Sequence, residues 1–249
     1  VERIFRQSVL HTRPAPVEPS YIPDKIVRAS LSHYDKNPLY RYLCGVFGEE
    51  ETARLFSLYR IGTSAKWGGS TVFWQTDESS KVRTGKIMLY NPVTGRRVKE
   101  PQARVSWAHA ELRLPDFNLR QCLFGQHLLP LYPDRTVFLV ESEKSAVIAA
   151  HYMPDVLWLA TGGKNGCFNV QTIGALRGRD VILLPDLGAT DAWREKLSML
   201  QPVCRSVAVS TLLEDMATDE QRSQGLDIAD FMLATPTCLQ ILQQMIQRN

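Results

Sequence analysis

The sequence lacks several features that define common protein classes. It has no run of 18 or more apolar residues, and its first 20 residues, VERIFRQSVLHTRPAPVEPS, have no apolar core of the kind found in signal peptides. The cysteines form neither CxxC pairs nor the dense pattern of a disulfide scaffold; they are Cys44, Cys122, Cys167, Cys204 and Cys238. We therefore expect a soluble, cytoplasmic protein with reduced cysteines, no membrane partner and no zinc in this fragment.

Signatures of nucleophilic catalysis and of P-loop nucleotide binding are also missing. No Ser or Cys nucleophile elbow occurs, and the stretch TGGKNG at residues 161–166 lacks the P-loop spacing. The five histidines have no partners at metal-ligand or triad spacing. The chain begins with Val rather than Met, and we expect it to be a piece of a longer protein.

Charge is distributed unevenly along the chain. Residues 1–130 hold 19 Lys and Arg against 12 Asp and Glu, whereas residues 131–249 hold 10 against 14. A basic region fits a polyanionic partner, and an acidic region can hold divalent cations. The alternative is a chance imbalance between solvated faces.

The first half predicts a mixed α+β region. A Pro-rich start up to SYIPD predicts an extended arm. Helical patterns cover residues 24–48, with a break near Pro38, and residues 48–62. The stretches STVFWQTD (70–77) and KVRTGKIMLYNP (81–92) flank a polar turn and predict a β-hairpin.

From Thr136 onward, apolar strands alternate with helices. We expect strands at 136–142, 156–161, 180–186 and 205–211, and helices at 143–153, 169–178 and 190–200. This alternation predicts a parallel sheet with helices on both faces. Ligands of such sheets gather at the carboxyl ends of the strands.

Carboxylates stand at two of these strand ends. Glu141 and Glu143 follow the first strand; Asp186 ends the third, and Asp191 comes five residues later. If the first and third strands are neighbours, these side chains converge and suit Mg²⁺. The alternative is that Glu141 and Asp186 only cap the helices that follow.

Both strand ends resemble motifs of the toprim domain, which is shared by bacterial primases, topoisomerases, a class of nucleases and recombination mediators. VFLVESEKSAVIAA (137–150) resembles its first motif, with Glu141 at the Glu position and Ser142 where Gly is usual. DVILLPDLGATDAW (180–193) resembles its second motif, Asp-x-Asp, with Asp186 at the first Asp. Gly188 replaces the second Asp, and Asp191 is the candidate substitute.

Further segments extend the resemblance to the catalytic core of bacterial DNA primases. LATGGKNG (159–166) is similar to a Gly-rich turn of primase-type toprim domains, and GLDIADFML (225–233), with Asp227 and Asp230, is similar to their late acidic segment. The hairpin at 70–97 is similar to one in the basic subdomain that precedes toprim in primases. As a whole, the chain resembles a primase-like bacterial family often associated with mobile elements. The resemblance implies a basic subdomain at 1–130 and a toprim domain at 131–249.

The resemblance implies metal-dependent nucleotidyl transfer, which is primer synthesis on single-stranded DNA from nucleoside triphosphates. Glu141 and Asp186 would be catalytic, and they would hold Mg²⁺ or Mn²⁺ together with Asp191 and Asp227. The phosphate-binding residues implied are Lys144, Lys164 and Asn165, and those for template phosphates are Arg83, Lys86, Arg96, Arg97 and Lys99. An RNA primer and a helicase or other replication protein are further expected partners.

Two points stay open at the level of sequence. Trp67, Phe73, Trp74 and Trp107 are either stacking platforms for bases or core residues. Gly188 motivates an alternative function, a catalytically weak toprim module that binds nucleic acid or a replication partner. A toprim nuclease is a third reading, whereas the chain is too short for the strand-gating domains of a topoisomerase.

Overall fold

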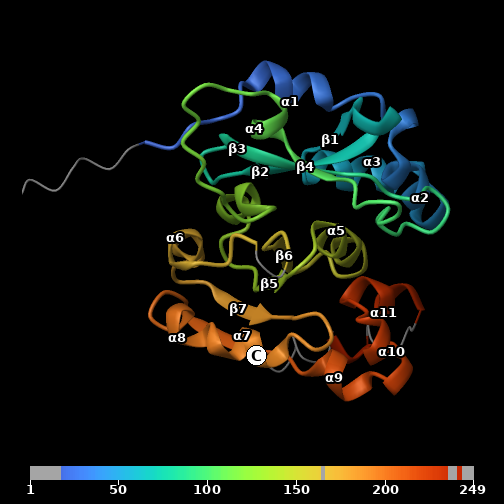
Figure 1. Cartoon of the computed structure of the whole chain (residues 1–249). Coiled ribbons are helices and arrows are strands. Elements are labelled where there is room, and N and C mark those ends of the chain that lie inside the picture. Colours follow the sequence, from blue (N-terminus) through green and yellow to red (C-terminus); the bar gives the residue numbers. More distant parts are fainter. Residues whose placement is uncertain (1–17, 164–165, 235–239, 243–249) are drawn as a thin grey trace, which may run out of the picture.

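The computed structural model describes residues 18–163, 166–234 and 240–242. It contains two four-stranded sheets: an antiparallel sheet of order β1-β2-β3-β4 in the N-terminal half and a parallel sheet of order β6-β5-β7-β8 in the C-terminal half (Figure 1). The predicted fold class, a helix-flanked parallel sheet preceded by a mixed α+β region, is confirmed. The predicted arm at the N-terminus lies mostly outside the described residues. Within the described ranges, no helix is both long and apolar enough to cross a membrane.

Helices lead into the antiparallel sheet. They are α1 (Asp24–Ser30), α2 (Pro38–Phe47) and α3 (Glu49–Leu58), with a 3₁₀ turn at Tyr34–Lys36. The predicted break near Pro38 is the start of α2, where the Asn37 side chain accepts hydrogen bonds from the amides of Leu39 and Tyr40. Asn is a favoured N-cap, and Pro is favoured at the first helical position because its missing amide has no partner there.

The antiparallel sheet contains the predicted hairpin and two strands that the sequence did not predict. The hairpin is β2 (Ser70–Thr76) with β3 (Val82–Met88), and Phe73 lies opposite Lys86. The outer strands are β1 (Ile61–Ser64) and β4 (Val105–Trp107), which leads into α4 (Ala108–Glu111). Phe73 and Trp74 are buried core residues, whereas Trp67 and Trp107 are partly exposed.

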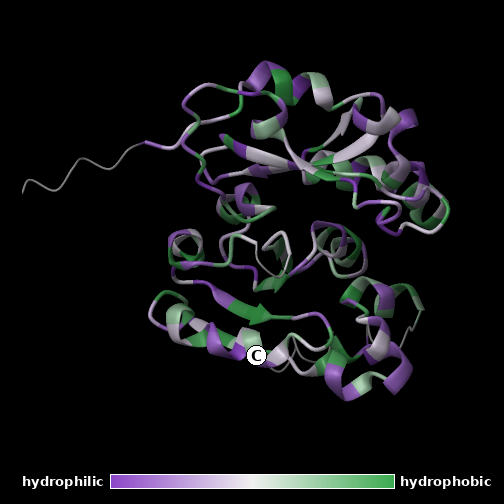
Figure 2. Cartoon of the chain, viewed as in Figure 1, coloured by the Kyte–Doolittle hydropathy of each residue, from purple (hydrophilic) through white to green (hydrophobic). Residues whose placement is uncertain are grey.

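The parallel sheet confirms the predicted strand and helix alternation. Its strands are β5 (Val137–Val140), β6 (Leu157–Ala160), β7 (Asp180–Leu183) and β8 (Ser206–Val209). Its helices are α5 (Glu143–Tyr152), α6 (Val170–Ile173), α7 (Thr190–Glu195), α8 (Leu197–Leu200), α9 (Leu212–Met216), α10 (Asp219–Gln224) and α11 (Ile228–Ala234). β5 and β6 are fully buried, and β7 is coloured hydrophobic along most of its length (Figure 2). β5 pairs directly with β7, so the carboxyl ends that carry Glu141 and Asp186 are adjacent.

The two halves meet along β6, the edge strand nearest the antiparallel sheet (Figure 1). The Tyr59 hydroxyl donates to the Trp158 carbonyl at 3.0 Å, and Phe124 and Ala160 exchange backbone hydrogen bonds. The connection includes a 3₁₀ helix at Gln126–Leu131. Apolar residues of both halves belong to one continuous core cluster. The parallel sheet and the antiparallel sheet therefore hold fixed positions on either side of any site between them.

Candidate active site

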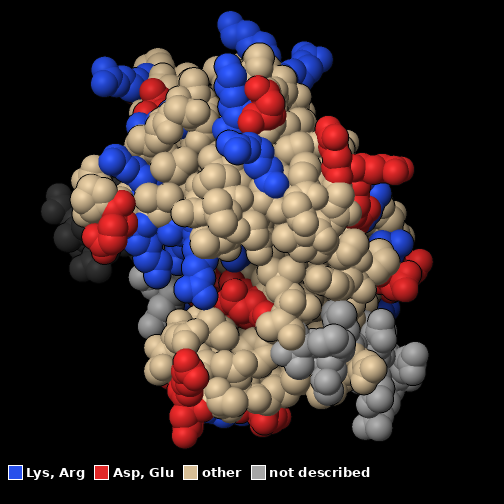
Figure 3. Space-filling model, turned by 90° about the vertical axis from the view of Figure 1, so that its right-hand side faces the viewer, with Lys and Arg blue, Asp and Glu red and all other residues tan. Residues whose placement is uncertain are grey.

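A cavity of about 800 Å³ lies between the two halves, over the carboxyl ends of β5 and β7. One wall consists of β3 and the loop that follows it, and the other of Glu141–Lys144, Asp186 and the segment before α11. Figure 3 shows acidic side chains near the middle of one face, with Lys and Arg above and beside them. The cavity therefore has an acidic wall and a basic wall.

Glu141 occupies the acidic wall directly after β5, and the residue is only 7% exposed. Its carbonyl accepts hydrogen bonds from the amides of Gly162 (3.0 Å) and Gly163 (2.8 Å). Both glycines have positive φ, +84° and +116°, a region that disfavours other residues. The Gly-rich turn seen in the sequence thus fixes the backbone of Glu141.

Asp186 follows β7 on the same wall. Burial raises its pKa from the usual 3.8 to about 8, with further contributions from the charges of Glu141, Asp227 and Asp230, while Arg97 acts in the opposite direction. Repulsion between nearby carboxylates favours the protonated form. Such a shift of the Asp186 pKa requires its carboxyl group to lie near those of Glu141, Asp227 and Asp230.

Asp227, directly before α11, and Asp230, in the first turn of α11, complete the acidic wall. The Ser145 hydroxyl, on α5, donates to Asp227 Oδ2 at 2.8 Å, and the Asp227 amide donates to Asp230 Oδ2 at 3.1 Å. Burial raises the pKa of Asp230, and the Asp227 charge adds to this effect. These hydrogen bonds hold both carboxylates in place, and the role of Asp227 as a metal ligand, which the resemblance implies, stays a prediction.

A buried ion pair joins the basic wall to the acidic wall. Lys86 Nζ, on β3, donates to Glu143 Oε2 at 3.2 Å and to the Gly162 carbonyl at 2.8 Å. The side chains of Lys86 and Glu143 are 10% and 2% exposed. Lys86 was predicted to hold template phosphate, but the structure places its ammonium group on protein oxygens. Glu143 was noted in the sequence, yet nothing there indicated this partner.

The other predicted phosphate-binding residues divide into two groups. Arg96, Arg97 and Lys99 are exposed and line the cavity, as does the partly buried Lys144. Arg83 does not line it, because its guanidinium pairs with Asp77 at 2.7 Å. Lys164 and Asn165 lie outside the described residues.

The predicted substitute ligand, Asp191, lies away from the cavity. Its side chain is 93% exposed on α7 and pairs with Arg194 at 2.8 Å. Asp191, in the first turn of α7, therefore faces solvent and does not return to the strand end. Gly188, at the place of the second motif Asp, has φ +80°.

The donor chemistry of the acidic wall suits a divalent cation bound with few protein ligands. Among the described residues, no three His, Cys, Asp or Glu side chains are arranged to hold one ion. Mg²⁺ is commonly bound through one or two carboxylates, with water and substrate phosphates as its other ligands. Glu141 and Asp186, on adjacent strand ends, fit this pattern.

Comparison with known proteins identifies a family and a fold. Residues 37–187 match the family described as a domain of unknown function, DUF6371, and the chain belongs to this family. No curated protein matches the chain.

Solved structures of primases share the fold. The RNA polymerase domain of Mycobacterium tuberculosis primase DnaG is 13% identical with a TM-score of 0.55, covering 88% of this chain and 80% of that one. The E. coli primase catalytic core is 12% identical with a TM-score of 0.50, covering 86% and 83%. A further DnaG catalytic core has 13% identity, a TM-score of 0.50 and the same coverage. The chain therefore has the fold of a primase catalytic core.

Proposed function

We propose that this protein is a primase-like nucleotidyl transferase that joins nucleoside triphosphates on a single-stranded DNA template with Mg²⁺ or Mn²⁺. One observation carries the proposal. Glu141 and Asp186 end adjacent parallel strands and share a cavity with the exposed Arg96, Arg97 and Lys99. The acidic wall suits a cation, and the basic wall suits phosphate groups.

Each wall has its own part in this reaction. Glu141 and Asp186 would hold the cation, with Asp227 and Asp230 adding negative charge nearby. A divalent cation bound there would neutralise phosphate charge and make the attacking hydroxyl more acidic. Glu141, which lines the cavity, would accept the proton of the 3′-hydroxyl as that oxygen bonds to the α-phosphorus of the incoming triphosphate and pyrophosphate leaves.

Positive charge would orient the reactants on both sides of that centre. Lys144, beside Glu141, would bind the triphosphate, while Arg96, Arg97 and Lys99 would bind template phosphates. Lys86 would instead join the walls, because Glu143 and the Gly162 carbonyl bind two of its three ammonium protons. We assign template binding to the basic region at 1–130 and cation binding to the toprim region at 131–249. A helicase or another replication protein would supply the template.

Incubation with a labelled single-stranded DNA template, nucleoside triphosphates and either Mg²⁺ or Mn²⁺ tests the proposal. New oligonucleotides should form with the wild type and not with Asp186→Asn. The matched control is Arg205→Gln, which breaks an exposed pair with Asp180 at the opposite end of β7. Loss of synthesis in the control as well would contradict the assigned role of Asp186.

A second function is favoured by Gly188 and by the absence of a three-ligand group among the described residues. A catalytically weak module would bind the template and make no product. The same experiment separates the two functions, because binding without new oligonucleotides supports the module. Shortening of the labelled template would instead identify a nuclease.

A further inference from the structure

The loop that follows Asp186 is tied to a carboxylate from a distant helix. The Gly188 amide donates to Glu214 Oε1 at 2.8 Å, and the Thr190 hydroxyl donates to the same oxygen at 3.3 Å. Glu214 lies on α9, which follows β8 in the chain. The carboxylate thus holds the loop at the position where the resembled motif has a second Asp.

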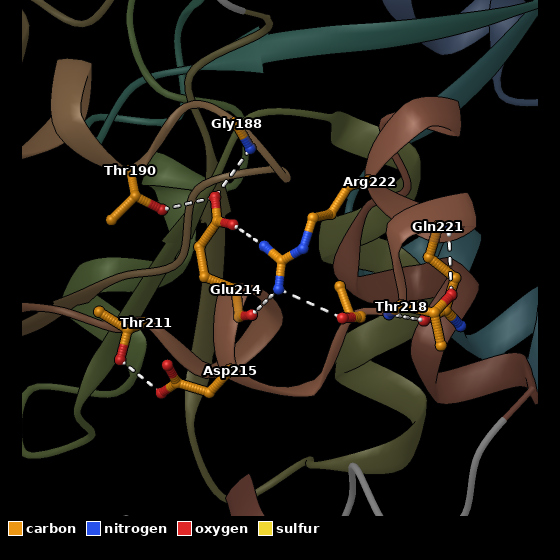
Figure 4. Close-up of polar contacts among 9 residues, drawn as sticks. Gly188, Thr190, Thr211, Glu214, Asp215, Thr218, Gln221 and Arg222 are labelled. Atoms are coloured by element: carbon orange, nitrogen blue, oxygen red, sulfur yellow. Dashed lines mark hydrogen bonds and ion pairs between the residues drawn. The ribbon is translucent and has the colours of Figure 1, made fainter.

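The other oxygen of Glu214 is bound by Arg222 on α10. Arg222 Nη1 donates to Glu214 Oε2 at 2.5 Å, and Nη2 donates to the Glu214 carbonyl and, at 3.2 Å, to the Ala217 carbonyl (Figure 4). Thr218 and Gln221 form a capping box that begins α10. Arg222 therefore donates to three oxygen acceptors, and it lies on a helix that has its own cap.

This pair lies between the segments that carry two cavity carboxylates. Gly188 is two residues after Asp186, and Arg222 is five residues before Asp227. The Leu187 amide also donates to the Leu226 carbonyl at 3.3 Å, which joins the same two segments directly. The pair and this hydrogen bond together connect the Asp186 loop to the Asp227 segment.

Glu214 does not serve as a replacement ligand. It is not among the residues that line the cavity, and Arg222 neutralises its carboxylate. Its oxygens are directed at Gly188, Thr190 and Arg222 instead. Its contacts therefore act on the backbone that carries Asp186.

We propose that Glu214 and Arg222 are positioning residues, which fix the Asp186 loop against the Asp227 segment and thereby set the affinity of the cavity for a divalent cation. The affinity part rests on the proposed function. Residues that orient metal ligands without touching the metal commonly change affinity 10- to 100-fold when they are substituted. The attachment of the loop to the segment does not depend on any cation.

Two measurements on the whole chain test the proposal. Mn²⁺ affinity is measured by calorimetry, and exchange of the Gly188 and Leu187 amides is measured by NMR without metal. The variants are Glu214→Ala, Glu214→Gln and Arg222→Lys. The matched control is Arg205→Gln, which removes a different exposed Arg and carboxylate pair, that of Arg205 with Asp180 at the start of β7.

Glu214→Ala should weaken Mn²⁺ binding about tenfold and speed exchange at both amides. Glu214→Gln keeps an acceptor for Gly188 but loses the charge that binds Arg222, so its effects should be smaller. Arg222→Lys should fall between Glu214→Gln and the wild type, because an ammonium can still pair with Glu214. Arg205→Gln should leave Mn²⁺ affinity and both exchange rates at wild-type values.

Several results would overturn the proposal. Unchanged exchange at Leu187 in Glu214→Ala would show that the pair does not join the two segments. Faster exchange with unchanged Mn²⁺ affinity would show that this attachment does not set affinity. An equal loss of affinity in Arg205→Gln would indicate a general loss of stability. A wild type that binds no Mn²⁺ would refute the proposed function and the affinity part, whereas the Leu187 result would still decide the structural part.

Discussion

The two walls of the cavity are built in different ways. On the acidic wall, Glu141 and Asp186 extend from buried strands, and hydrogen bonds hold the segments around them. On the basic wall, Arg96, Arg97 and Lys99 are exposed on the loop after β3. Fixed carboxylates suit a cation that requires defined geometry, and exposed cationic side chains suit contact with phosphates. The difference predicts that cation binding and template binding can be lost separately.

The largest expected effect comes from removing a carboxylate of the acidic wall, and it is an effect on catalysis. Glu141→Gln and Asp186→Asn should each reduce primer synthesis about a thousandfold, because several kcal/mol of charge stabilisation by the cation are lost. Single-stranded DNA affinity, measured by fluorescence anisotropy, should stay close to the wild-type value. A parallel loss of DNA affinity in folded variants would show that the walls do not act separately.

The next largest effect is expected on stability, at the ion pair of Lys86 and Glu143 that joins the two walls. Lys86→Met leaves Glu143 buried without its cation and should lower the free energy of unfolding by about 3–5 kcal/mol. Urea denaturation provides the measurement. The double variant Lys86→Met with Glu143→Leu should recover much of this loss, since it leaves no buried charge. If Lys86→Met and the double variant lose the same free energy of unfolding, the unpaired charge of Glu143 is not the cause of the loss.

A smaller effect is expected in the pH dependence of stability without metal. Because the folded-state pKa of Asp186 is raised from 3.8 to about 8, the folded protein binds a proton that the unfolded chain has lost between these values. Stability should therefore fall as pH rises from about 4 to about 8. Asp186→Asn should flatten this slope and stabilise the fold at pH 8 by on the order of 1–3 kcal/mol.

Asp180 provides the matched control for that pH series. Hydrogen bonding to Arg205 lowers the pKa of Asp180 to about 2, so its contribution to stability is lost only below pH 4. Asp180→Asn should consequently leave the slope between pH 4 and pH 8 unchanged. Urea denaturation across this range in chelator-treated buffer measures both variants. If the free energy of unfolding falls with pH as steeply in Asp186→Asn as in the wild type, the raised pKa of Asp186 is refuted.

Substitutions on the basic wall should have modest effects on DNA affinity. Arg96→Gln, Arg97→Gln and Lys99→Gln should each weaken single-stranded DNA binding and lower the slope of log affinity against log salt by about 0.7. Arg83→Gln should leave that slope unchanged, because Arg83 pairs with Asp77 outside the cavity. If the slope of log affinity against log salt is the same for the wild type and the three loop variants, the template does not bind at this loop.

The smallest effect is expected at Asp191. Asp191→Asn should leave Mn²⁺ affinity unchanged, because this carboxylate is exposed and faces Arg194. Calorimetry of Asp191→Asn beside Asp186→Asn gives a direct contrast between two acids five residues apart. A tenfold loss of Mn²⁺ affinity in Asp191→Asn would show that Asp191 does contribute to the metal site.

Local sequence patterns were sufficient for much of the fold and for part of the acidic wall. Continuous apolar runs followed by Glu141 and Asp186 predicted the strands, which the structure confirms. The structure adds that these two strands are neighbours, the condition on which convergence of the two carboxylates depended. The polar turn between residues 77 and 81 predicted the hairpin, also confirmed. These features follow from residues near one another in the chain. β1 and β4 escaped prediction because they lack the continuous apolar runs that identified the equally short strands of the parallel sheet.

Contacts between distant residues could not be read from the sequence. Lys86 and Glu143 are 57 residues apart, and Gly188 and Glu214 are 26 apart. No spacing rule connects such positions, since their contact depends on how the two sheets and the last helices pack. Arg83 and Asp191 are a different case, because their partners Asp77 and Arg194 are only six and three residues away. The i,i+3 spacing of Asp191 and Arg194 on a helix was a signal present in the sequence.

Calorimetric titration of the metal-free chain with Mn²⁺ at pH 8, with Asp186→Asn and Arg97→Gln alongside, tests the central claim most directly. We predict millimolar or tighter binding in the wild type, little change in Arg97→Gln and no binding in Asp186→Asn. Absence of binding in the wild type, or full binding in Asp186→Asn, would contradict a cation site at the carboxyl ends of β5 and β7.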